Sequence, residues 1–92
     1  MIIAKVVGTV ISTRKNQNLI GNKFLIVEPV SEMNYDNKNR IVAIDNVGAG
    51  VGEIVLVVFG SSARIGCGMP DSPVDAAIVG IVDSIKDVII ED

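Results

Sequence analysis

The chain has 92 residues, a formal net charge of −3 and no histidine, and these properties exclude several classes of protein. A chain of this length is expected to fold as one domain spanning residues 1–92. Its acidic balance argues against binding nucleic acid through the phosphates. Cys67 is the only cysteine, so we expect an ordinary thiol that completes neither an internal disulfide nor a zinc site.

The composition predicts an aliphatic β protein with apolar surface to spare. Hydrophobic residues make up 49% of the chain and aromatic residues only 3%, which favours a core of β-branched strands. A domain of this size buries only about 60 to 65% of the surface that its unfolded chain exposes. We therefore expect apolar area outside the core, which self-association would cover.

The N-terminal segment 2–13 is rich in Ile, Val and Thr and predicts a strand, with a bend or bulge at Gly8. Lys5 interrupts its apolar run, which is far shorter than the roughly 20 residues of a membrane-spanning helix. The run also lacks the basic region and cleavage site of a signal peptide. We therefore expect a cytoplasmic protein with no membrane partner.

Three further strands are predicted in the middle of the chain. Segment 23–30 is ended or placed at an edge by Pro29, and a solvated loop over 31–40 follows. A short strand over 41–45 leads into a glycine-rich stretch. The strand over 53–60 is apolar on both faces, which implies that both faces are covered.

The last third of the chain predicts one helical turn and a fifth strand. Ser61 or Ser62 is a candidate N-cap for a turn over 61–66, which Gly66 closes. Segment 74–85 alternates as a strand with a second bend at Gly80, and an apolar triplet follows at 88–90. The expected fold is mostly β: a small five-stranded, OB-like β-barrel, closed or nearly closed, with one short helical turn.

The stretch DNVGAGVGE, residues 45–53, invites a phosphate-binding interpretation that its context does not support. Its spacing is GxGxG, a predicted strand follows in place of a helix, and the Lys-Ser/Thr pair of a P-loop is missing. No cofactor is therefore expected. The absence of histidine removes the usual general base, so we expect no enzyme and interpret the scattered carboxylates as solvation: Asp45, Glu53, Asp71, Asp75 and Asp83.

A binding module for single-stranded nucleic acid is the main alternative that the residues themselves leave open, because small barrels often bind oligonucleotides. Such a face needs aromatic and basic side chains, whereas Phe24, Tyr35 and Phe59 are the only aromatic residues. Nucleic acid is therefore not an expected partner. What remains is a binding or structural role in which glycines allow close approach of backbones at an interface.

Four groups of residues form motifs along nearly the whole chain: Thr13, Lys15, Leu19, Gly21 and Lys23, the set Asp45, Gly48, Ala49, Gly50, Gly52 and Glu53, the run from Gly60 to Arg64, and the run from Pro73 to Ala76. These motifs resemble those of the bacterial microcompartment vertex proteins of the EutN/CcmL family. The resemblance implies a β-barrel subunit that assembles into a cyclic pentamer, with a ring of six as the alternative. It implies a place at the vertices of a polyhedral protein shell beside hexameric shell proteins, and no catalysis.

Two of these motifs are the predicted subunit interface or pore. Arg64 would reach a carboxylate or backbone carbonyls of a neighbouring subunit, or would be a solvated surface charge. The glycines of the first motif would alternatively be turn residues inside one subunit. The predicted contact residues are Asp45, Gly48, Ala49, Gly50, Gly52, Glu53, Ser61, Ser62 and Arg64.

Overall fold

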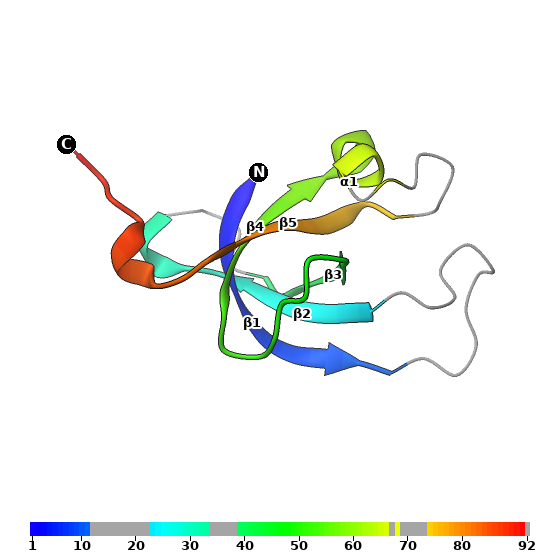
Figure 1. The fold of residues 1–92 in the computed structure, drawn as a ribbon, viewed down its shortest axis with the longest axis horizontal. Helices are drawn as coiled ribbons and strands as arrows, with labels where there is room; N and C mark the ends of the chain where they lie inside the picture. The colour runs from blue at the N-terminus through cyan, green and yellow to red at the C-terminus, as the bar shows by residue number, and fades with distance from the viewer. Residues whose placement is uncertain (12–22, 34–38, 67, 69–73, 92) are drawn as a thin grey trace.

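Five strands and one short helix make up the computed structural model, which describes residues 1–11, 23–33, 39–66, 68 and 74–91. Two 3-10 turns, η2 (Ser31–Met33) and η3 (Ile85–Asp87), follow β2 and β5. Figure 1 shows η3 and the C-terminus at one end of the molecule and α1 toward the other. The remaining elements are β1 (Ile2–Val10), β2 (Lys23–Pro29), β3 (Ile41–Asp45), β4 (Ile54–Phe59), α1 (Gly60–Gly66) and β5 (Ala76–Val82).

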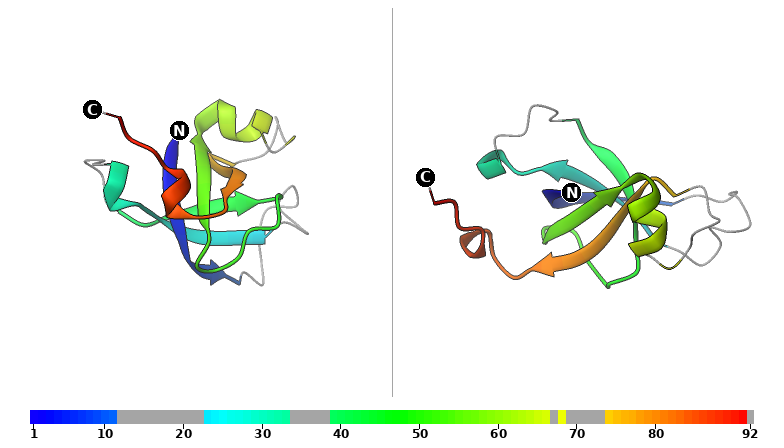
Figure 2. Two further views of the ribbon diagram at one scale, coloured as in Figure 1. Left: turned by 60° about the vertical axis from the view of Figure 1, so that its left-hand side comes forward. Right: turned by 90° about the horizontal axis from the view of Figure 1, so that it is seen from above.

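The strands form a closed barrel in the order β1-β2-β3-β5-β4, seen from two further sides in Figure 2. Four of the strand pairs are antiparallel, and β4 closes the ring by pairing with β1. The β3–β5 pair is parallel and extends over only two residue pairs, Ile44 with Ala77 and Asp45 with Ile78. This arrangement confirms the predicted mostly β, five-stranded barrel with one short helical element.

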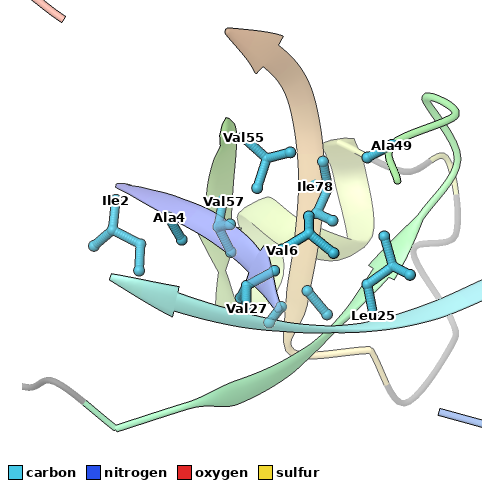
Figure 3. Packing of buried hydrophobic residues seen from close by; sticks show 11 residues of the cluster. Ile2, Ala4, Val6, Leu25, Val27, Ala49, Val55, Val57 and Ile78 are labelled. Carbon is cyan, nitrogen blue, oxygen red and sulfur yellow. The ribbon is translucent and has the colours of Figure 1, made fainter. Parts of the chain in front are cut away.

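Aliphatic side chains fill the barrel because strand residues alternate between its inside and outside. Figure 3 shows Val6, Val27, Val55, Val57 and Ile78 converging from four strands, and each is fully buried. A second cluster lies outside the barrel wall, where Ala63 of α1 packs with residues of three strands: Ile44, Val58 and Ala77. The helix therefore covers one part of the outer surface.

Both predicted bends occur where the strand register shifts. Val6 pairs with Val27 and Gly8 with Ile26, so β1 carries one extra residue beside Gly8. In the β4–β5 pair the register shifts between Leu56 and Val57, next to Gly80. A Cβ atom on Gly80 would lie 3.1 Å from Leu56 Cδ1, which shows why a glycine suits this position.

Several element boundaries differ from the sequence-based expectation. β5 ends at Val82, short of the predicted residue 85, because Ser84 caps η3: its hydroxyl accepts a hydrogen bond from Lys86 N, and Asp87 accepts one from Ser84 N. α1 begins at Gly60, whose N–H donates to Asp75 O at 2.8 Å. Ser61 and Ser62 therefore lie within the first turn, and the prediction that one of them is the N-cap was wrong.

Other predicted features lie partly or wholly outside the described residues. β1 ends at Val10, and the last two positions of the predicted strand over 2–13 are not described. Tyr35, Cys67 and Asp71 also lie outside the described residues. Within the described part of the chain, no helix is both long and apolar enough to cross a membrane.

The outer face of β4 is covered over only part of its length, contrary to the expectation from its apolar sequence. Val55 and Val57 face the core, and Val58 lies under α1. Ile54 and Leu56, on the outer side, stay half-buried. Apolar outer positions on β3 and β5 are also open, with Val42 49% and Ile81 37% exposed. The predicted surplus of apolar surface is therefore present on the isolated subunit.

Candidate subunit interface

A buried carboxylate holds the start of the glycine loop, residues 46–53. Asp45, the last residue of β3, is only 5% exposed. One of its oxygens accepts a hydrogen bond from Val47 N at 3.1 Å and the other accepts one from Ala49 N at 3.0 Å. Aspartate suits this position because its short side chain reaches backbone N–H groups a few residues ahead. In the folded subunit Asp45 is thus an internal anchor.

Lys23 and Ala49 complete this anchor. The Lys23 ammonium donates to Ala49 O at 2.6 Å and lies 3.6 Å from the Asp45 carboxylate, and the two charged residues face each other across the β2–β3 ladder. Ala49 is fully buried and packs into the core cluster (Figure 3). The loop therefore places one small side chain inside the barrel and holds it there through both its N–H and its carbonyl.

The second half of the loop is a tight turn tied to β1. Glu53 N donates to Gly50 O at 3.1 Å, and Gly52 has a φ of 95°, as a type II turn requires at that position. Gly52 N donates to Val6 O and Val6 N donates to Glu53 O, at 2.8 and 2.9 Å. The turn within one subunit thus explains Gly52.

Gly50 is different, because the subunit itself leaves room for a side chain there. A Cβ atom on Gly50 would lie 3.4 Å from the Glu53 carboxylate, and its φ lies outside the left-handed region. Glu53 Oε1 accepts a hydrogen bond from Gly50 N at 2.6 Å. Neither backbone conformation nor packing inside the chain therefore demands glycine at position 50.

The second predicted contact stretch lies on α1. Ser61 and Ser62 are exposed, whereas Arg64 is half-buried. Arg64 Nη1 donates to Val74 O at 3.2 Å, which ties the helix to the segment before β5. Its predicted reach toward a neighbouring subunit stays a prediction, as does the part of the other residues in a subunit contact.

The structure places the two predicted stretches on different surfaces. In Figures 1 and 2 the turn over residues 50–53 and α1 lie on opposite sides of the barrel. Asp45 and Ala49 are buried, Gly50 is half-buried, and Gly48, Gly52 and Glu53 are exposed. Within one chain the two stretches therefore do not form one continuous patch.

Each of these stretches also contains an exposed aliphatic residue that is not among the predicted contact residues. Val51, at the tip of the turn, is 62% exposed, and Ile65 on α1 is 72% exposed. Val51 lies between Gly50 and Gly52, and Ile65 follows Arg64. These three neighbours are all predicted contact residues. An aliphatic residue in an otherwise polar or glycine-rich loop is the signal that would have identified them.

An open acidic cleft lies between β1, the end of β2, and the start of η3. Lys5 is the basic residue of its lining, and Glu28, Glu32, Glu53 and Asp83 are the acidic ones. Among the described residues no three His, Cys, Asp or Glu side chains are placed to hold a metal ion. The described chain thus offers surfaces for contact and no assembled metal site.

We predict that Asp45→Ala lowers the free energy of unfolding by about 1 to 3 kcal/mol, because the buried Ala49 N–H loses its acceptor. Urea unfolding followed by circular dichroism at a fixed subunit concentration measures this change. Asp83→Ala removes an exposed carboxylate and should change stability by less than about 0.5 kcal/mol. Equal midpoints for the two variants would show that the Asp45 anchor is unimportant.

The sequence matches a known family and named relatives over almost its full length. The family model described as ethanolamine utilisation protein EutN/carboxysome matches residues 1–83. The chain is 49% identical over 88 residues to the bacterial microcompartment shell vertex protein GrpN of Rhodospirillum rubrum, covering 96% of this chain and 99% of that protein. It is 47% identical to the carboxysome shell vertex protein CcmL of Synechocystis, covering 94% and 86% of the two chains.

Solved structures of such proteins share the fold. The structure of CcmL from a Nostoc species has a TM-score of 0.81 at 48% identity, covering 91% of this chain and 90% of the other. The structure described as the GrpN pentameric microcompartment shell protein from Rhodospirillum rubrum has a TM-score of 0.76, covering 91% and 94%. Since sequence and fold agree over this length, the chain belongs to the EutN/CcmL family that its motifs resemble.

Proposed function

We propose that this chain is a structural subunit that assembles into a cyclic pentamer and caps the vertices of a bacterial microcompartment shell. The observation that carries this proposal is its similarity over 96% of its length to a shell vertex protein whose solved structure is described as pentameric. These relatives are shell components by name, so the role is structural, not catalytic.

The outer surface of the barrel supports a ring. A ring is built from a heterologous contact, in which one surface of each subunit packs on a different surface of the next. Apart from the buried cluster under α1, partly or largely exposed apolar positions occur on the outer face of β2 and β3 and of β4 and β5, on either side of the short β3–β5 pair. They are Phe24, Ile26 and Val42 on β2 and β3, and Ile54, Leu56 and Ile81 on β4 and β5.

The partners at the shell follow from the geometry of a closed polyhedron. Flat sheets of hexameric shell proteins cannot close by themselves, and a five-fold element at each corner allows closure. We infer that the pentamer contacts hexameric shell proteins along its rim. The two separate surfaces that carry Val51 and Ile65 leave room for contacts of both kinds, within the ring and beyond it.

The purified chain is expected to have a solution mass of five subunits, because a ring covers the apolar outer positions. Native mass spectrometry at micromolar concentration measures this mass directly. A mass of six subunits would replace the pentamer by a hexamer. A monodisperse monomer would contradict any ring.

In a cell that builds the matching compartment, deletion of this subunit is expected to leave shells with facets that close poorly. Electron microscopy of thin sections and of purified shells would show the defect, and restoring the gene would be the matched control. Normally closed shells in the deletion strain would count against a role at the vertex.

Gly50→Val tests whether a neighbouring subunit approaches the turn. The subunit has room for a Cβ atom at this position, so folding should be preserved. Overpacking against a neighbour should cost about 1 to 3 kcal/mol at each contact of the ring. The expected result is a parental circular dichroism spectrum with a smaller solution mass.

Gly52→Val is the matched control for this experiment. Its φ of 95° is strained for any other residue by about 1 to 2 kcal/mol, so this variant should lower the unfolding midpoint of the subunit itself. If Gly50→Val assembles as fully as the parent chain, the prediction that a neighbouring subunit approaches Gly50 closely is wrong.

A further inference from the structure

The C-terminal segment lies beyond the part of the chain that the family model matches, which ends at residue 83. After η3 the backbone becomes extended at Val88, with φ −89° and ψ 107°. Ile89 and Ile90 are 75% and 56% exposed. Figures 1 and 2 show this segment leading away from the barrel. A segment that leaves the barrel with extended backbone at Val88 and carries two adjacent exposed isoleucines is suited to pair with the edge of another sheet.

One strand of the barrel offers such an edge. β3 pairs with β2 along its whole length, but its pairs with β5 begin only at Ile44. Among the described strand pairs, the three residues from Ile41 to Ala43 therefore have a partner strand on one side only. Val42 points outward and is 49% exposed. Ile41 is half-buried and packs against the core cluster.

A basic residue precedes this edge, and an acidic residue follows the isoleucines of the tail. The Arg40 side chain is 67% exposed and lies 3.4 Å from one oxygen of Glu28 through its Nε. A guanidinium has five N–H donors, so it can contact a second carboxylate. Glu91 directly follows Ile90 and is exposed. Edge and tail thus match in polarity as well as in apolar character.

We propose that residues 88–91 of each subunit add as an antiparallel strand to the β3 edge of the neighbouring subunit. This inference rests on the proposed ring. Antiparallel pairing with Ile89 opposite Val42 places Ile90 opposite Ile41 and Glu91 opposite Arg40. Side chains alternate between the two faces, so Ile89 and Glu91 lie outside with Val42 and Arg40. Ile90 points inward beside Ile41.

Other placements of the tail are less favourable. The acidic cleft beside η3 carries Glu28, Glu32, Glu53 and Asp83, which would repel the carboxylate of Glu91. If the tail packed on the barrel of its own chain, it would have to turn back from the direction in which it leaves η3. Addition to the next subunit repeats around a closed ring and covers every exposed edge and every tail.

Disulfide trapping tests this register. In a Cys67→Ser background, Ile89→Cys and Val42→Cys are combined in one chain and oxidised mildly. Directly opposite residues of an antiparallel pair have Cα atoms about 4.5 to 5.5 Å apart, a separation that a disulfide spans. The expected result is a ladder on a non-reducing denaturing gel that reaches five subunits and collapses on reduction.

The matched control combines Ile89→Cys with Val51→Cys, because Val51 is similarly exposed, at 62%, but lies on the turn between Gly50 and Gly52. This pair should give no ladder. Chains of the test pair that stay monomeric on the gel, unlinked or linked internally, would overturn the proposal. Native mass spectrometry before oxidation separates the two hypotheses: a pentamer without a ladder refutes only the tail contact, whereas a monomer refutes the ring and the tail contact together.

Charge reversal tests the pairing of Arg40 with Glu91. Arg40→Glu in the test pair should slow formation of the ladder about twofold to fivefold, the range expected for an exposed ion pair. Adding Glu91→Arg should restore the parental rate, because the two charges again have opposite sign. A rate that stays low or falls further in the double reversal would overturn the proposed register.

Discussion

The buried carboxylate of Asp45 is the constraint on which the rest of the subunit depends. It ends β3, accepts two backbone N–H groups of the glycine loop, and faces Lys23 across the ladder. This network holds Ala49 in the core and directs the chain toward the turn that pairs with β1. Without the contacts of this network, the connection between β3 and β4 would leave the buried Ala49 N–H without its acceptor.

The barrel is small, and the core cluster formed by its described residues consists of aliphatic side chains. Each strand turns one set of residues inward, so a chain in which almost half of the residues are hydrophobic must place many others outside. α1 covers the outer face around Ile44, Val58 and Ala77. The remaining outer positions on β2 to β5 need another partner, and assembly of identical subunits provides one. Fold and assembly thus follow from the same excess of apolar surface.

The glycine loop combines two requirements that a sequence motif cannot separate. Gly52 occupies a left-handed turn position, so its role is explained inside one subunit. Gly50 has neither a positive φ nor a close neighbour that forbids a side chain. The same short motif therefore contains Gly52, which the turn requires, and Gly50, which neither backbone conformation nor packing within the chain requires.

The sequence by itself determined the number of strands, their approximate positions and the two bends. The pattern of β-branched residues, the glycines at 8 and 80, and Pro29 at the end of β2 act over a few neighbouring residues, so their effects can be predicted locally. The motifs of the sequence also indicated the family to which the chain belongs. The end of β5 was misjudged because the Ser84 capping box competes with a strand pattern that looks continuous.

Only the tertiary structure decided which members of the glycine motif are internal. Asp45 and Ala49 look like surface residues in the sequence, but both are buried, because Asp45 accepts a hydrogen bond from Ala49 N and Ala49 packs into the core cluster. The separation of the turn from α1 and the one-sided pairing of Ile41 to Ala43 depend equally on contacts between distant segments. Such contacts follow from closure of the barrel, which brings together residues that are far apart in the chain. No local pattern contains that information.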